Sequence, residues 1–185
     1  ERSGAYLGST VQIIPHVTTE IKEAIYSLAK KTAADVVVTE IGGTTGDIES
    51  QPFLEAIRQI GHEVGRHHCL FIHVTLVPYL KSSGEHKSKP TQHSVKELMA
   101  SGIFPDIIVT RSDEILEADI KEKIALFCNV KRDCVIENKT VGVLYEAPMM
   151  LHAEKLDEIV VRELQLDTNQ PDLTEWEAML DRITK

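Results

Sequence analysis

The sequence predicts a doubly wound α/β fold, in which a mostly parallel sheet carries helices on both of its faces. Short apolar runs alternate along the chain with segments whose apolar residues recur at helical spacing. The longest run, residues 69–77, is nearly continuous in its apolar character, which is typical of a strand buried on both faces of a parallel sheet. Polar loops follow two of the runs, where ligands of such sheets bind.

The composition is that of a globular protein with reduced cysteines. The 185 residues are 42% apolar and 26% charged, enough for one domain with its own core. The net charge of −9 argues against broad nucleic-acid binding, which requires a basic surface. Three cysteines without a CxxC pair favour a cytoplasmic location over a disulfide framework. No apolar run approaches the ~20 residues needed to cross a bilayer, so we expect no membrane partner.

The first 39 residues predict a strand, a helix and a second strand. Residues 10–14 can be extended, and Pro15 would end that strand. A helix follows, because apolar residues recur on one face at Ile21, Ala24, Ile25 and Leu28. Residues 36–39 contain three consecutive valines and predict a short buried strand.

The stretch from Glu40 to Ser50, EIGGTTGDIES, is the feature around which the chain is organised. Its three glycines let the backbone turn sharply and approach a ligand. Three carboxylates, those of Glu40, Asp47 and Glu49, lie within ten residues, and carboxylates near a phosphate usually mean magnesium. A solvated acidic turn explains the stretch equally well, so the residues alone leave both interpretations open.

A helix over residues 52–64 is better defined. Ser50 can cap it, and Pro52 suits its first turn. Its buried face is predicted from the helical spacing of Phe53, Ile57, Ile60 and Val64. In the apolar run that follows, His73 is expected to be a core histidine with a satisfied hydrogen bond.

The second informative stretch is KSKPTQHS, residues 87–94, which follows the longest apolar run. Lys87 and Lys89 bracket Ser88, and in an extended segment such residues project from the same face. Two ammonium groups would then reach one polyphosphate, and the N-terminus of the next helix would add N–H donors. A basic solvated loop is the alternative, and the local composition favours it.

Strands and helices continue to alternate towards the end of the chain. The next segments are predicted to be a strand over 106–110, a helix over 115–127, a strand over 134–136 and a turn with a short extended piece over 139–144. A helix is predicted from Pro148 to Leu164, then a polar loop over 167–171. The last helix is predicted from the apolar residues Leu173, Trp176, Met179, Leu180 and Ile183.

The usual nucleotide-binding motifs are missing from the sequence. Neither G-x-x-x-x-G-K-[ST] nor a G-x-G-x-x-G after a strand is present. Either the ligand is held differently, or the phosphate cradle lies outside this chain. The sequence opens at Glu1 without an initiator Met or a visible signal peptide, so we expect an excised piece or a chain whose beginning is absent.

Several stretches resemble the synthetase, or amidoligase, domain of the CTP synthase family. They are GGTTGDIES at 42–50, KSKPTQHS at 87–94, QIIPH at 12–16, PFLEAIRQ at 52–59 and FCNV at 127–130. The resemblance covers nearly the whole chain in the right order. Thr45 stands where the family usually has Val, and Ser88 where it usually has Thr. Neither departure removes a group that the implied roles need.

The resemblance implies a larger enzyme, a ligase with a partial P-loop NTPase-like synthetase domain in this chain. In that family an upstream segment carries the P-loop that binds ATP, and a C-terminal glutaminase domain supplies ammonia. Residues 1–165 would be the C-terminal portion of the synthetase domain. Residues 166–185 would form a terminal helix and the start of the linker towards the glutaminase domain. The resemblance also implies a cytoplasmic homotetramer, and a fragment that is inactive alone.

The implied reaction is the ATP-dependent amination of UTP to CTP with glutamine-derived ammonia. Glu40 matches the family's magnesium ligand. The positions that match contacts to UTP and CTP are Asp47, Ile48, Glu49, Lys87, Ser88, Lys89, Pro90, Thr91, Gln92 and Lys123. Lys139, Thr140 and Val141 match positions beside the adenine of ATP. The catalytic lysines and the second metal-binding carboxylate are expected upstream of Glu1.

Two other functions remain open at this point. One is an ATP-dependent P-loop ligase of the dethiobiotin synthetase type, which would not need the KSKPTQ stretch. The other is a non-catalytic nucleotide-binding and assembly module. Nucleotide-binding assays would separate the first from CTP synthesis, and turnover by the intact protein would separate the second.

Overall fold

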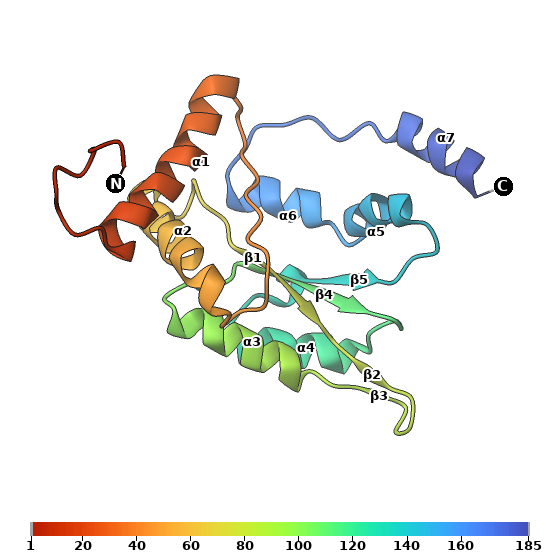
Figure 1. Cartoon of the computed structure of the whole chain (residues 1–185). Helices are drawn as coiled ribbons and strands as arrows, with labels where there is room; N and C mark the ends of the chain where they lie inside the picture. Colours follow the sequence, from red (N-terminus) through yellow and green to blue (C-terminus); the bar gives the residue numbers. More distant parts are fainter. Residues whose placement is uncertain (1, 185) are drawn as a thin grey trace.

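The computed structural model describes residues 2–184 and is built on a parallel sheet (Figure 1). In the described residues this sheet has three strands in the order β1–β4–β5, with β1 at Ile72–Leu76, β4 at Ile107–Ser112 and β5 at Val135–Lys139. Val109 of β4 lies opposite Val74 of β1 and Ile136 of β5. Helices pack on both faces of the sheet, so the predicted doubly wound α/β fold is confirmed.

The remaining elements surround this sheet. The described helices are α1 (Thr18–Thr32), α2 (Gln51–Val64), α3 (Lys89–Ala100), α4 (Ala118–Cys128), α5 (Ala147–Ala153), α6 (Leu156–Glu163) and α7 (Thr174–Ile183). A small antiparallel hairpin, β2 (Tyr79–Leu80) and β3 (Glu85–His86), follows β1. Short helical turns occupy Ile13–Val17, Ile48–Ser50, Arg132–Cys134 and Leu144–Glu146. No helix in the described part of the chain combines the length and apolar character that crossing a bilayer requires.

The core has two layers, one on each side of β4 and β5. Helices α3 and α4 cover one face, and α5 and α6 cover the other (Figure 1). Because strand side chains alternate in direction, Ile108 packs in the first layer while Ile107 and Val109 pack in the second. These three side chains are at most 4% exposed, so β4 is buried on both faces.

Strand β1 differs from the prediction in its burial. His73 and Thr75 face α3 and are buried, but Ile72, Val74 and Leu76 are between 43% and 61% exposed. The expectation of burial on both faces is therefore wrong for β1. The physical reason is that β1 is an edge strand among the described residues, and α5 packs against β5 at the opposite edge.

Two predicted strands in the N-terminal region do not form. The segment 10–14 enters an irregular helical turn that begins at Ile13, and residues 36–39 pair with no described strand. Val36 and Val38 are 46% and 89% exposed. A strand requires a neighbour to accept its backbone hydrogen bonds, and apolar side chains alone do not supply one.

Other boundaries shift by a few residues. The long apolar run forms a strand only from Ile72, and α4 begins at Ala118 instead of residue 115. The single helix predicted from Pro148 to Leu164 is two helices, because Lys155 takes a left-handed conformation with φ of 64°. The hairpin β2–β3 was not predicted. The predicted helices α1, α2, α3 and α7 are all present.

Candidate functional site

The carboxyl ends of the parallel strands define one edge of the sheet. Beyond it, β1 leads through the hairpin to Lys87, while β4 and β5 end at Ser112 and Lys139. Ligands of open α/β sheets bind beyond such an edge. The basic stretch and the segment from Lys139 to Val141 both follow this edge, as the chain order of strand and loop predicts.

Lys87 forms an ion pair with Glu85 on the hairpin. The Lys87 Nζ atom lies 2.6 Å from Glu85 Oε1, and the Lys87 N–H donates to the Pro78 carbonyl at 3.0 Å. The pKa of Glu85 is lowered, first by the hydrogen bond from Lys87, then by the hydrogen bond from Ser83 and least by the charge of Lys123 on α4. The charge of Lys123 therefore acts on the same carboxylate that pairs with Lys87.

The geometry between Lys87 and Lys89 differs from the prediction. Ser88 is helical, with φ of −81° and ψ of −13°, and Lys89 is the first residue of α3. The prediction of an extended segment with both lysines on one face is therefore wrong. Glu85 and Lys87 are the residues that share a face. Lys89 and Pro90 are exposed at the start of α3, where the first N–H groups of a helix have no helical acceptor.

Three polar residues of the same stretch have structural partners. Thr91 is fully buried, and its hydroxyl donates to the Leu76 carbonyl at 3.3 Å and lies 3.2 Å from the Thr75 hydroxyl. Ser88 is buried and accepts a hydrogen bond from the Gln92 amide at 3.0 Å. These contacts fix the start of α3 against β1. Lys87 and Lys89 therefore carry the charge of the stretch, while Ser88 and Thr91 hold its shape.

The glycine-rich loop closes on itself. The Asp47 carboxylate accepts the Thr44 N–H at 2.9 Å, and the Ser50 hydroxyl donates to the Gly42 carbonyl at 3.1 Å. Ser50 makes no side-chain cap on α2, so its predicted capping role is wrong. Gly43 has a φ of 95°, and a Cβ there would meet the Ser50 hydroxyl at 3.0 Å, so this turn requires glycine.

A polar chain attaches this loop to α3. The His73 Nε2 atom lies 2.9 Å from the Ser94 hydroxyl, which lies 3.5 Å from the Thr45 hydroxyl. Burial lowers the pKa of His73, so the expectation of a satisfied core histidine is confirmed. Ser94 is five residues beyond Lys89, or about 7.5 Å along the helix axis. The loop and the basic stretch therefore meet α3 at different levels.

The carboxylates of the loop do not form a metal cage. Glu40, Asp47, Ile48 and Glu49 are all exposed, and Asp47 is engaged with Thr44. Within residues 2–184, no group of three or more His, Cys, Asp or Glu side chains is placed to hold a metal ion. Glu40 presents an exposed carboxylate beside the turn at Gly42.

The segment after β5 is tied to the segment after β4. The Thr140 N–H donates to the Ser112 carbonyl at 2.8 Å, and the Thr140 hydroxyl donates to Asp113 Oδ1 at 3.0 Å. Lys139 and Val141 on either side are half-buried. The N–H and the hydroxyl of Thr140 are thus both engaged within the protein.

The comparison with known proteins shows which family the chain belongs to. The family model described as "CTP synthase N-terminus" matches residues 1–166, most of the chain. The chain belongs to the CTP synthase family. It is 62% identical over all 185 residues to the CTP synthase of Clostridium kluyveri, 34% of whose length it covers. It is 57% identical over 182 residues to that of Carboxydothermus hydrogenoformans and 55% over 183 residues to that of Geobacillus kaustophilus.

The chain spans about a third of the length of these CTP synthases. The resemblance identified in the sequence is therefore confirmed at the level of the family. Membership in this family argues against a ligase of the dethiobiotin synthetase type. It leaves the residue-by-residue assignments as proposals.

Sequence reasoning missed a buried ionic cluster centred on Lys121 of α4. The Lys121 Nζ atom lies 2.8 Å from Glu154 Oε2 and 3.1 Å from Glu137 Oε2, and Lys121 is only 9% exposed. Burial opposes ionisation of Glu154, but hydrogen bonds from Lys121 and from the Glu137 N–H outweigh it and lower its pKa. The cluster joins α4, β5 and the end of α5, and so fixes the helix that carries Lys123.

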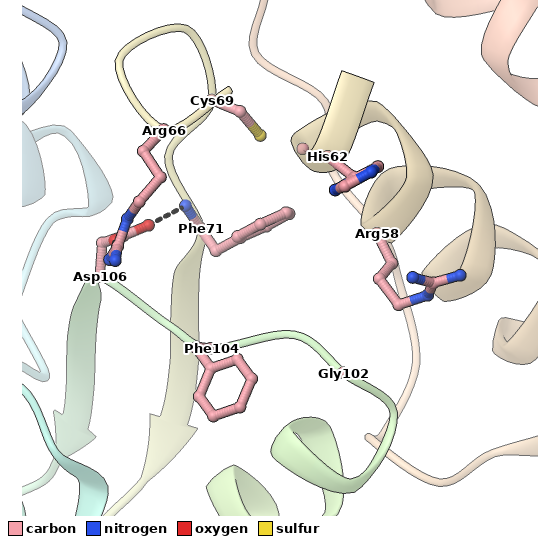
Figure 2. A pocket seen from close by; sticks show the side chains of 9 residues that line it. Arg58, His62, Arg66, Cys69, Phe71, Gly102, Phe104 and Asp106 are labelled. Atoms are coloured by element: carbon pink, nitrogen blue, oxygen red, sulfur yellow. Dashed lines mark hydrogen bonds and ion pairs between the residues drawn. The ribbon is translucent and has the colours of Figure 1, made fainter. Parts of the chain in front are cut away.

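Figure 2 shows a pocket at the amino ends of β1 and β4, the ends opposite those that lead to the candidate site. Its volume is about 320 Å³, and its lining residues are Arg58, Gly61, His62, Arg66, Cys69, Phe71, Gly102, Phe104 and Asp106. Phe71 and Asp106 immediately precede β1 and β4, so the pocket is at the amino ends of the strands. None of the predicted site residues lines it, and burial raises the pKa of the Cys69 thiol. The carboxyl edge remains the candidate site.

Proposed function

We propose that the chain takes part in the ATP-dependent amination of UTP to CTP, as the pyrimidine-nucleotide-binding part of a larger ligase. Its membership in the CTP synthase family supports the proposal. The observation that carries it is the ion pair between Lys87 and Glu85 at 2.6 Å beside the start of α3, at a carboxylate on which the charge of Lys123 also acts. Two ammonium groups and the N-terminus of a helix suit the charge and the donor requirement of a triphosphate.

In this proposal the Glu85 carboxylate is the counter-ion of the lysines when no nucleotide is bound. The triphosphate takes over the ammonium groups of Lys87 and Lys123, and Lys89 adds a third charge at the first residue of α3. Pro90, Gln92 and the buried hydroxyls of Ser88 and Thr91 keep this end of the helix in place. Because UTP and CTP share the triphosphate, both would use the same lysines.

The glycine-rich loop would supply the other contacts. Magnesium is commonly held in phosphate sites by one or two carboxylates together with phosphate oxygens, and the exposed Glu40 would be one of these carboxylates. The ion would neutralise charge on the phosphoryl group transferred from ATP to O4 of the uracil. Asp47, Ile48 and Glu49 would contact CTP in its inhibitory mode. Lys139, Thr140 and Val141 would lie beside the adenine of ATP, mainly through backbone groups.

The remaining parts of the proposal concern the whole protein. Ammonia would come from glutamine hydrolysed in a further domain, and it would displace the phosphate from C4. A cytoplasmic homotetramer is proposed as the working form. The chain alone would make no CTP, because it contains no phosphate cradle for ATP. CTP formation by the 185-residue chain above a heat-killed control would contradict this, and absence of turnover by the intact protein would favour a non-catalytic module.

Lys87→Ala in the full-length protein tests the triphosphate site. Losing one charge-assisted contact should cost about 1.5–3 kcal/mol, so the KM for UTP and the inhibition constant for CTP should both rise about ten- to a hundredfold. Lys81→Ala is the matched control, because Lys81 is an exposed lysine of the same hairpin turn. Unchanged constants for Lys87→Ala, at fixed salt and magnesium, would show that the basic stretch is only a solvated loop.

Glu49→Ala tests the division of labour between the two stretches. Glu49 is exposed on the loop and lies apart from the lysine cluster, so its loss should weaken CTP inhibition more than UTP use. The measurement is the ratio of the CTP inhibition constant to the KM for UTP. An equal shift of both constants would contradict the assignment of Glu49 to the CTP-bound mode.

A further inference from the structure

His86 is a fully buried histidine next to the proposed triphosphate contacts. It lies in β3 opposite Tyr79, whose ring centroid is 4.9 Å from that of His86. Because side chains alternate along a strand, His86 points inward while Glu85 and Lys87 point outward. The hairpin contains only two residue pairs, so its own ladder holds it weakly. The inward contacts of His86 therefore matter for where Lys87 lies.

The polar contact of His86 reaches the start of α4. Its Nδ1 atom lies 2.6 Å from Glu117 Oε2, and Glu117 is the residue that precedes α4. The Glu117 carbonyl accepts the first N–H bonds of that helix, from Ile120 at 3.1 Å and Lys121 at 3.3 Å. The pair thus joins the basic hairpin to the first turn of the helix that carries Lys123.

The two ring nitrogens of His86 show what an imidazole adds at this position beyond an apolar ring. An ionised Glu117 carboxylate has no proton to donate. In this hydrogen bond the His86 Nδ1 atom is therefore the donor and carries the proton. The Nε2 atom is buried and has no hydrogen-bond partner among the described residues. A phenylalanine ring would fill the same space without an unsatisfied atom. The hydrogen bond to Glu117 is therefore what the imidazole adds.

We propose that His86 is a positioning residue of the triphosphate site, which sets Lys87 relative to Lys123 through its hydrogen bond to Glu117. The proposal rests on the proposed function of those lysines. Lys87 directly follows His86, and Lys123 lies six residues beyond Glu117, about 9 Å along α4. Lys87 pairs with Glu85 at 2.6 Å, and Lys123 is on the helix that the hydrogen bond reaches, so a shift of the hairpin against α4 would move Lys87 relative to Lys123.

The test uses three variants of the full-length protein. His86→Phe keeps the ring and removes the donor, and His86→Asn keeps a donor near the Nδ1 position. Glu117→Gln weakens the acceptor from the exposed side of the pair, where Glu117 is 47% exposed. His86→Phe and Glu117→Gln should raise the KM for UTP, the inhibition constant for CTP and the calorimetric dissociation constant for CTP by the same factor, about three- to tenfold. The kcat should stay within about twofold, and His86→Asn should recover most of the loss.

His152→Phe is the matched control. It removes another histidine–carboxylate pair, His152 Nδ1 to Asp157 Oδ2 at 2.8 Å, which has no contact with the lysines. If His86→Phe lowers only kcat and thermal stability, or acts like His152→Phe, the positioning role is overturned. If His86→Phe does not fold, unchanged constants in Glu117→Gln overturn it.

Lys87→Ala separates the two proposals. If Lys87→Ala changes both nucleotide constants while His86→Phe and Glu117→Gln change neither, only the positioning role is overturned. If Lys87→Ala changes neither constant, the triphosphate site and the positioning role are overturned together. Combining His86→Phe with Glu117→Gln should add nothing to either single change, since both break the same hydrogen bond.

Discussion

Two neighbouring strands of the sheet, β4 and β1, are both apolar but differently buried. Ile107 of β4 is fully buried, whereas Ile72, its neighbour in register on β1, is 43% exposed. The segment 36–39, which precedes the glycine-rich loop, is also exposed and unpaired among the described residues. Apolar sequence therefore specifies the strand itself, but its burial depends on which other elements are present to cover it.

The same contrast separates stability from function. The β4–β5 side is held by two apolar layers and by the Lys121 cluster. The glycine-rich loop, on the other side, is attached to α3 through Thr45 and Ser94 and presents exposed carboxylates. Loops attached to a rigid scaffold are where binding residues concentrate. Substitutions on the β4–β5 side should therefore reduce mainly stability. Substitutions in the glycine-rich loop should reduce mainly activity.

The largest effect on activity is expected for Glu40→Gln in the full-length protein. The substitution keeps the shape but removes a charged oxygen ligand, so phosphoryl transfer should fall about a hundredfold or more while the fold survives. The measurement is the rate at several magnesium concentrations, with circular dichroism as a check of folding. Glu23→Gln, an exposed glutamate of α1, is the control. Full activity at saturating magnesium, or unfolding, would contradict the metal role.

The largest effect on stability is expected for Ile107→Ala. This change opens a cavity in a fully buried site and should cost about 2–5 kcal/mol of unfolding free energy in the 185-residue chain. The same change at Ile72 removes a half-exposed side chain and should cost about 1 kcal/mol or less. Urea unfolding of both variants measures the difference. Equal costs would mean that the open face of β1 is covered in solution.

Repeating the pair in the full-length protein sharpens the comparison. The relatives are about three times as long as this chain, and we expect residues outside it to cover the open face of β1. The cost of Ile72→Ala should then rise towards that of Ile107→Ala. A cost that stays small in the longer protein would show that the face of Ile72 remains open there as well.

The elements that the sequence predicted are those with local signals. Helix α2 follows from the spacing of Phe53 and Ile57 with Pro52 in its first turn, and β4 and β5 follow from short apolar runs beside helices. The open face of β1 and the missing strand at 36–39 could not be predicted, because both depend on neighbours that local sequence does not specify.

The candidate site shows the same limit. The two lysines of the basic stretch were recognisable, but Lys89 is the first residue of a helix, whose first turn Pro90 suits. The contacts of Lys121 with Glu137 and of His86 with Glu117 join residues 16 and 31 positions apart. Such pairs leave no periodic signal. An isolated lysine inside the apolar face of α4 was the one available sign of the first.

The smallest effect is expected for Glu85→Gln in the full-length protein, and its sign is what matters. The Glu85 carboxylate pairs with Lys87 and is also held ionised by Lys123, which together lower its pKa. It therefore stays charged at neutral pH and competes with a triphosphate for the same ammonium groups. The neutral amide should lower the KM for UTP and the inhibition constant for CTP by about two- to fivefold. Glu114→Gln, exposed in the loop after β4, is the control. Higher constants for Glu85→Gln would mean that the carboxylate orients the lysines for the nucleotide instead of competing with it.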